Sequence, residues 1–126
     1  MAKFRYWNEN PLGKEVSDCV TRAIKLASGL PYSTIRKKLF HTKELLDCES
    51  PYCSSCYGFL VQEVLGGVPK NCDGMTVGEF ADHYPYGTYL VRIEGHLTCI
   101  KAPATVYDIW DCRSKLCDLA WKMPNN

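Results

Sequence analysis

The stretch "GTYLVRIEGHLTCIKA", residues 87–102, decides which fold class the sequence predicts. Its two halves, 87–94 and 96–102, are rich in residues that favour β-strands. The pair Glu94-Gly95 between them suits a tight turn, so the stretch predicts two adjacent antiparallel strands. Further along, "TVYDIWD" (105–111) predicts a third strand and "KLCDLAWKM" (115–123) a fourth.

The sequence before this stretch favours helices. In "VSDCVTRAIKLASGL" (16–30), apolar residues recur at helical spacing, Ser17 is a plausible N-cap, and Gly29 gives a stop signal. A second helix is expected over 34–46, capped by Ser33, with three apolar side chains turned inward: Ile35, Leu39 and Phe40.

Shorter helical segments complete the prediction. Residues 57–67 suggest a third helix, and Thr76 and Glu79 have the spacing of a capping box at the start of a fourth. Residues 1–16 and 47–56 suggest irregular chain. We therefore predict a single α+β domain over residues 1–126, with N-terminal helices packed on a C-terminal antiparallel sheet.

Composition restricts the classes of partner. The 126 residues carry a formal net charge of +1, which gives no electrostatic case for binding nucleic acid or an anionic membrane surface. No segment has the length and apolarity of a signal peptide or a membrane span, so a cytoplasmic protein is expected. In a reducing cytosol the eight cysteines are expected to be free thiols, metal ligands or catalytic groups rather than disulfides.

Cys19 is the first candidate for chemistry. It falls in the first turn of the predicted helix, where free N–H groups and the helix dipole favour a thiolate, the nucleophilic form of cysteine. Burial as a small core residue is the commoner fate of a cysteine. Helix position alone therefore leaves both interpretations open.

A nucleophile also needs a base and a group that orients the base. His96 opens a predicted strand, whereas His41 and His83 are expected at the surface. If strands 96–101 and 105–111 are antiparallel neighbours, either Asp108 or Asp111 can lie beside His96. The alternative is an isolated histidine and two surface acids.

The chain order of helix cysteine, strand histidine and strand acid resembles the papain-like cysteine peptidases, in particular compact papain-like proteins of bacteriophages. The resemblance lies in "DCVTRAI" (18–24), "TVGEFADHYPYGTYLVRIEGHLTCI" (76–100) and "VYDIWD" (106–111), and residues 33–72 have no counterpart in it. It implies a Cys19–His96 ion pair. It also favours Asp108, which is followed two residues later by Trp110, over Asp111 as the third member.

The resemblance further implies an oxyanion hole formed by the Cys19 backbone N–H and a side-chain amide. Papain-like enzymes often place a glutamine six residues before the cysteine, where this sequence has Gly13. Asn10 or Asn8 could supply the amide instead, although both residue types are also common in turns. Arg22, one helical turn after Cys19, is expected to be a solvated surface residue.

A metal site is the rival interpretation. Cys48, Cys53 and Cys56 follow a C-x4-C-x2-C spacing, and Cys72 could complete a four-thiolate zinc site. Free thiols are the alternative, and no cofactor is expected for the favoured function. That function is a phage or prophage cysteine hydrolase, a peptidase or isopeptidase/amidase, acting on a protein or peptide that could belong to the host cell. The alternatives are a non-catalytic accessory protein that binds and inhibits a host protein, and a zinc-stabilised interaction module.

Overall fold

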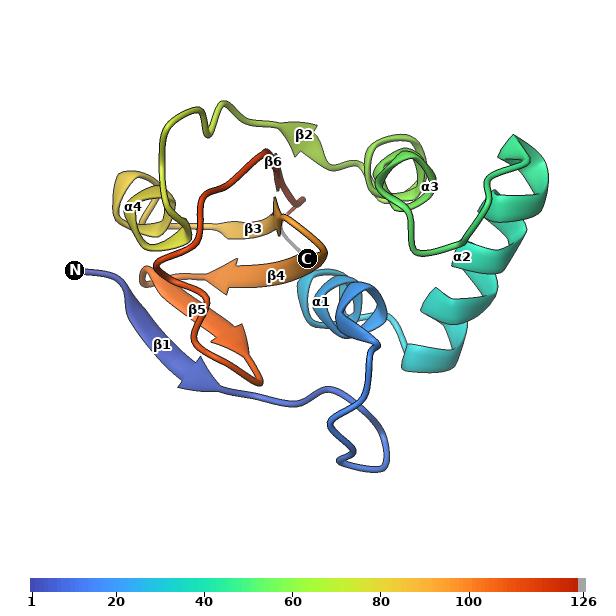
Figure 1. Cartoon of the computed structure of the whole chain (residues 1–126), viewed down its shortest axis with the longest axis horizontal. Helices are drawn as coiled ribbons and strands as arrows, with labels where there is room; N and C mark the ends of the chain where they lie inside the picture. The colour runs from blue at the N-terminus through green and yellow to red at the C-terminus, as the bar shows by residue number, and fades with distance from the viewer. Residues whose placement is uncertain (125–126) are drawn as a thin grey trace.

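The predicted strand pair lies at the centre of the sheet in the computed structural model, which describes residues 1–124 (Figure 1). Strand β3 (Thr88–Ile93) pairs antiparallel with β4 (His96–Lys101), and Ile93 faces His96 across the turn. β5 (Thr105–Asp108) adds to the far edge of β4, and β6 (Leu119–Lys122) pairs with β3. The sheet has the order β1-β5-β4-β3-β6-β2.

The outer strands correct two predictions. β1 (Lys3–Tyr6), in a segment expected to be irregular, runs parallel to β5, so the sheet is mixed rather than antiparallel. β2 (Val68–Pro69) is the opposite edge. Most side chains of β1 are exposed, so the segment lacks the alternation of buried and exposed residues that marks a strand. Its backbone hydrogen bonds to β5 and the neighbouring turn hold it in place.

Residues 1–124 contain four α-helices: α1 (Cys19–Ser28), α2 (Tyr32–Leu46), α3 (Ser54–Phe59) and α4 (Val77–His83). A π-helical turn, Leu60–Val64, continues α3. The α+β class is thus confirmed. None of these helices combines the length with the apolar character needed to cross a membrane.

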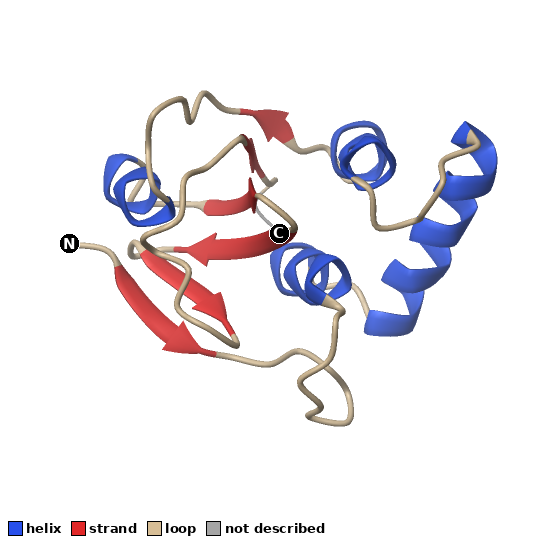
Figure 2. Ribbon diagram, in the orientation of Figure 1, coloured by secondary structure: helices blue, strands red, loops and turns tan. Residues whose placement is uncertain are grey.

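Helices cover both faces of the sheet (Figure 2). α1 and α3 pack on one face, and α2 lies behind them against both helices (Figure 2), through a cluster that includes Ile24, Leu39 and Leu97. α4 packs on the other face, where Phe80 contacts the strand residues. Alternating residues of β3 supply the two clusters, with Leu90 in the first and Val91 in the second, as the period of a strand requires.

Helix boundaries differ from the prediction at two N-termini. The N-cap residue of α1 is Asp18, not Ser17, and α2 starts after Pro31 rather than at Ser33. Phe40, expected inward, is exposed and makes an edge-to-face contact with Tyr52. The side chain of Asp18 does not cap the helix; it binds Arg22 instead. A capping pattern in the sequence does not reveal this contact.

The predicted capping box at α4 is present. The Thr76 hydroxyl accepts a hydrogen bond from the Glu79 N–H at 3.1 Å, and the Glu79 carboxylate accepts one from the Thr76 N–H at 3.0 Å. We expect Thr76→Ala to lower the free energy of unfolding by about 1 kcal/mol, because the Glu79 N–H loses the hydroxyl that accepts its hydrogen bond. Urea denaturation measures the change. Thr76→Ser, which keeps the hydroxyl, should stay close to the wild type.

Candidate active site

Cys19 is the first residue of α1 and lies beside the start of β4. Its sulfur is half-buried, and the nearby His96 ring and the backbone N–H of Leu97 both act to lower the pKa of the thiol. Its backbone N–H belongs to the first helical turn, whose amides have no acceptor inside the helix. The thiol is therefore surrounded by donors, which favour its ionised form.

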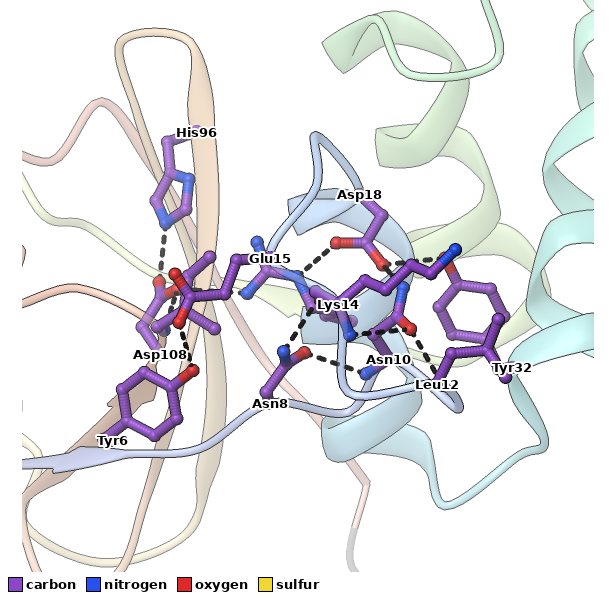
Figure 3. A network of polar contacts seen from close by, with 12 residues as sticks. Tyr6, Asn8, Asn10, Leu12, Lys14, Glu15, Asp18, Tyr32, His96 and Asp108 are labelled. Carbon is purple, nitrogen blue, oxygen red and sulfur yellow. Dashed lines mark hydrogen bonds and ion pairs between the residues drawn. The ribbon is translucent and has the colours of Figure 1, made fainter.

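His96 connects Cys19 to an acid. Its Nε2 lies 2.6 Å from Oδ2 of Asp108, as Figure 3 shows, so Nδ1 is the nitrogen left for the sulfur. The β4–β5 register pairs Cys99 with Tyr107, so Asp108, at the end of β5, comes next in the direction of His96. The structure thus brings the predicted Cys19, His96 and Asp108 together.

The surroundings favour charges on all three groups. Burial alone would lower the pKa of His96, but hydrogen bonds with Asp108, Cys112 and Cys19 and the charge of Asp108 raise it to about 11. Burial would raise the pKa of Cys19, yet the contacts with His96 and Leu97 bring it below the ordinary value of a thiol. In the interval between the two pKa values, the pair exists as thiolate and imidazolium.

A buried arginine holds the other oxygen of Asp108. Arg22 Nη1 lies 3.3 Å from Oδ1, which also accepts the Ile109 N–H at 2.7 Å. The prediction of a solvated Arg22 was wrong: the residue is 7% exposed. Its position on α1 faces β5, where the buried charge of Asp108 needs a counter-ion. The i,i+4 spacing of Asp18 and Arg22 in the sequence indicates the ion pair between these two residues, but not the pair between Arg22 and Asp108.

Asp18 is the second anion bound by Arg22. Its Oδ1 accepts the Arg22 Nε–H, and its Oδ2 accepts the Tyr32 hydroxyl at 2.7 Å and the Asn10 amide at 2.9 Å. Burial and the hydrogen bond to Asp18 raise the pKa of Tyr32 to about 12, so the phenol stays protonated and donates. These contacts anchor the residue just before Cys19 to α2 and to the preceding loop.

The two candidate oxyanion donors are engaged in that loop (Figure 3). The side-chain amide of Asn10 donates to Asp18, and that of Asn8 donates to the Lys14 carbonyl at 2.9 Å. Their side-chain oxygens accept backbone N–H groups, including the Leu12 N–H at 2.9 Å. The turn interpretation therefore describes both residues here, and their oxyanion role has no support from the geometry.

Asp111 lies away from the histidine. It is paired with Arg113 through Oδ2 at 2.7 Å, and both side chains are largely exposed. β5 ends at Asp108, so Asp111 lies beyond the strand, whereas the prediction had a strand reaching to 111. Trp110 instead lies against the His96 ring, with 4.9 Å between the ring centroids, and shields it.

The proposed four-cysteine zinc set is divided between two places. Cys48 contacts the thiols of Cys53 and Cys56, but Cys72 contacts Cys117 on the way into β6. Within residues 1–124, the one group of three or more His, Cys, Asp or Glu ligands that lie close enough for a metal is His96, Asp108 and Cys112. Cys112 has no predicted role, and nothing in its local sequence places it beside His96.

The space next to Cys19 is small. A cavity of about 10 Å³ lies between Cys19, Trp7, Leu26 and Tyr107, which is about the volume that one water molecule needs. Larger cavities of about 470 and 460 Å³ lie elsewhere, under α3 and beside α4.

Comparisons with known proteins found no match to the chain among family models, curated proteins or solved structures. The site must accordingly be interpreted from its own geometry.

The ion pair predicts a reactive Cys19 at mildly acidic pH. At pH 6 an ordinary thiol is about 0.3% ionised, whereas Cys19 should keep its thiolate until the pH falls below its lowered pKa. We expect limiting iodoacetamide at pH 6 to modify Cys19 at least about 10-fold faster than glutathione, measured by peptide mapping. His96→Ala should remove most of this advantage. Equal rates for Cys19 and glutathione would contradict the ion pair.

The buried arginine predicts a large effect on stability. Arg22→Met leaves the buried carboxylates of Asp18 and Asp108 without their cation, so we expect it to lower the free energy of unfolding by about 3–5 kcal/mol. The matched control is Arg92→Met, which breaks the exposed pair with Asp118 and should cost about 0–1 kcal/mol. Equal losses in urea denaturation of the two variants would contradict a structural role for the buried pair.

Proposed function

We propose that this protein is a cysteine hydrolase of the papain-like type that cleaves amide bonds of proteins or peptides. The observation that carries the proposal is the chain of side chains Cys19–His96–Asp108, in which Nε2 of His96 lies 2.6 Å from Oδ2 of Asp108 and the His96 ring lowers the pKa of the Cys19 thiol. Such a chain supplies a nucleophile, a proton carrier and an orienting acid. The chain order of these residues, helix then strand then strand, is the order expected from the papain-like resemblance.

The first half-reaction forms a thioester. The Cys19 thiolate attacks the carbonyl carbon of the scissile amide, and the electron pair of the C=O π bond moves to oxygen. As the C–N bond breaks, Nδ1 of His96 donates its proton to the leaving amine. The acyl group then remains on the sulfur, and His96 is a neutral imidazole.

The second half-reaction releases the acid. A water molecule attacks the thioester carbonyl while Nδ1 of His96 accepts its proton. The C–S bond breaks, a carboxylic acid leaves, and the thiolate–imidazolium pair forms again. Asp108 stays ionised throughout, because hydrogen bonds from His96 and Ile109 hold its pKa below the ordinary value in spite of burial. It fixes the ring with Nδ1 toward the sulfur.

Two features favour a second candidate, a binding protein with the same fold but little catalysis. The cavity at Cys19 has the volume of a single water molecule, and the amides of Asn8 and Asn10 are occupied within the loop. An oxyanion hole would then rest on backbone N–H groups. In this case the host protein bound by the chain would be held equally well by Cys19→Ala.

The two candidates are separated by turnover. We expect the wild type to hydrolyse fluorogenic peptide amides or isopeptide-linked substrates, and Cys19→Ala to lose at least about 1,000-fold in kcat/KM. Asp108→Ala should also lose activity, since His96 loses its orienting partner. Asp111→Ala is the matched control, because this acid pairs with Arg113 at the surface, and it should stay within about twofold.

A trapping experiment tests the nucleophile even if none of the peptide amides or isopeptide-linked substrates is cleaved. A peptide carrying an electrophilic vinyl sulfone should add once to the wild-type chain, at Cys19, as seen by intact mass and peptide mapping. Modification spread over several cysteines, together with no turnover of any amide, would rule out the hydrolase. It would leave the binding protein as the better account.

A further inference from the structure

Cys112 is a third polar group beside the His96–Asp108 pair, and the proposed reaction does not use it. Its sulfur lies 4.0 Å from Oδ2 of Asp108 and within 4.8 Å of a nitrogen of the His96 ring. One ligand atom from each of the three residues lies within 4.8 Å of the other two. The set combines imidazole, carboxylate and thiol, which are the ligand types that Zn²⁺ takes in proteins.

The two oxygens of Asp108 have separate partners. Oδ1 is held by Arg22 and by the Ile109 N–H, whereas Oδ2 faces Nε2 of His96 and Sγ of Cys112. Arg22 therefore neutralises the carboxylate from one side without covering the oxygen that the imidazole and the thiol share. Oδ2, Nε2 and Sγ converge on one point from three chain segments: β5, the start of β4 and the turn after β5.

The spacing is close to that of a tetrahedral zinc site. Bond lengths of about 2.0 Å to N or O and about 2.3 Å to S place O and N about 3.3 Å apart, and O and S about 3.5 Å apart. The structure has 2.6 Å for Oδ2 to Nε2 and 4.0 Å for Oδ2 to Sγ. Shifts of about 0.5–0.7 Å, within the reach of small side-chain rotations, would therefore fit the ion.

Burial of the three ligands favours tight binding of a cation. Cys112 is 0% exposed and Asp108 is 3% exposed, and the Trp110 ring lies against His96. Water competes poorly for a cation in this setting. A thiolate and a carboxylate with a neutral imidazole also balance the charge of a divalent ion, so the buried site requires no further anion.

We propose that a thiophilic divalent cation of the Zn²⁺ class binds Nε2 of His96, Oδ2 of Asp108 and Sγ of Cys112, and thereby switches off the Cys19–His96 pair. The regulatory half of this proposal rests on the proposed function, whereas the binding half does not. Binding releases two protons to solvent, one from the Cys112 thiol and one from Nε2 of the imidazolium. His96 then carries no charge to stabilise the Cys19 thiolate and accepts no proton from water.

The experiment uses Co²⁺ and Zn²⁺ on the full chain. The Cys48, Cys53 and Cys56 thiols form a separate cluster, so the reference protein is the triple variant Cys48→Ser/Cys53→Ser/Cys56→Ser. We expect one Co²⁺ per chain, with a thiolate-to-metal charge-transfer band, that one equivalent of Zn²⁺ displaces. Adding Cys112→Ser should abolish the band and weaken Zn²⁺ binding at least 100-fold. Cys72→Ser, which removes another buried thiol, is the matched control and should keep both.

The functional arm measures iodoacetamide modification of Cys19 at pH 6, with each variant compared with its own metal-free rate. Zn²⁺ should slow the reaction at least 10-fold in the reference protein and less than twofold with Cys112→Ser. A charge-transfer band that persists in Cys112→Ser, or Zn²⁺ that accelerates amide hydrolysis, would overturn the proposal. A metal-free Cys19 that is unreactive would instead contradict the proposed function, and the Co²⁺ band would still test the site.

Discussion

The buried charge of Asp108 is the constraint on which the site depends. A carboxylate taken out of water needs compensation, and here it comes from Arg22 on α1, the Ile109 N–H, and His96 on β4. These partners lie on α1, on β4 and directly after β5, so the ion pair ties α1 to strand β5 of the sheet. Because Cys19 precedes Arg22 on the same helix, this link also fixes where the sulfur meets the imidazole.

The pKa values of the buried cysteines differ according to the groups that surround each sulfur. Burial raises the pKa of Cys99 to about 12, and burial together with Cys72 raises that of Cys117 to about 12. Cys19 is also substantially buried, yet its pKa falls below the ordinary value because His96 and the Leu97 N–H donate to it. Desolvation is thus common to these thiols, and hydrogen-bond donors around the sulfur make the difference.

The same arrangement that prepares Cys19 also gathers ligands for a cation. Oδ2 of Asp108 serves the imidazole in the metal-free protein and would serve the metal in the bound one. A proton on Nε2 and a divalent ion are therefore alternatives at one position. Hydrolysis, which moves a proton at Nδ1, and metal binding at Nε2 would compete through the charge of the one His96 ring, with no need for a change of fold.

The sequence by itself determined the α+β class, the strand pair 88–93 and 96–101, the capping box at Thr76, and the candidates Cys19 and His96 with Asp108 or Asp111 as the acid. Each follows from local patterns or from residue order. Only the tertiary structure decided that β1 pairs parallel with β5, that Arg22 is buried, that Asp111 turns away to Arg113, and that Cys112 lies beside His96. These depend on contacts between residues far apart in the chain, such as Arg22 and Asp108, and no local periodicity or propensity encodes the partner that a buried charge will find.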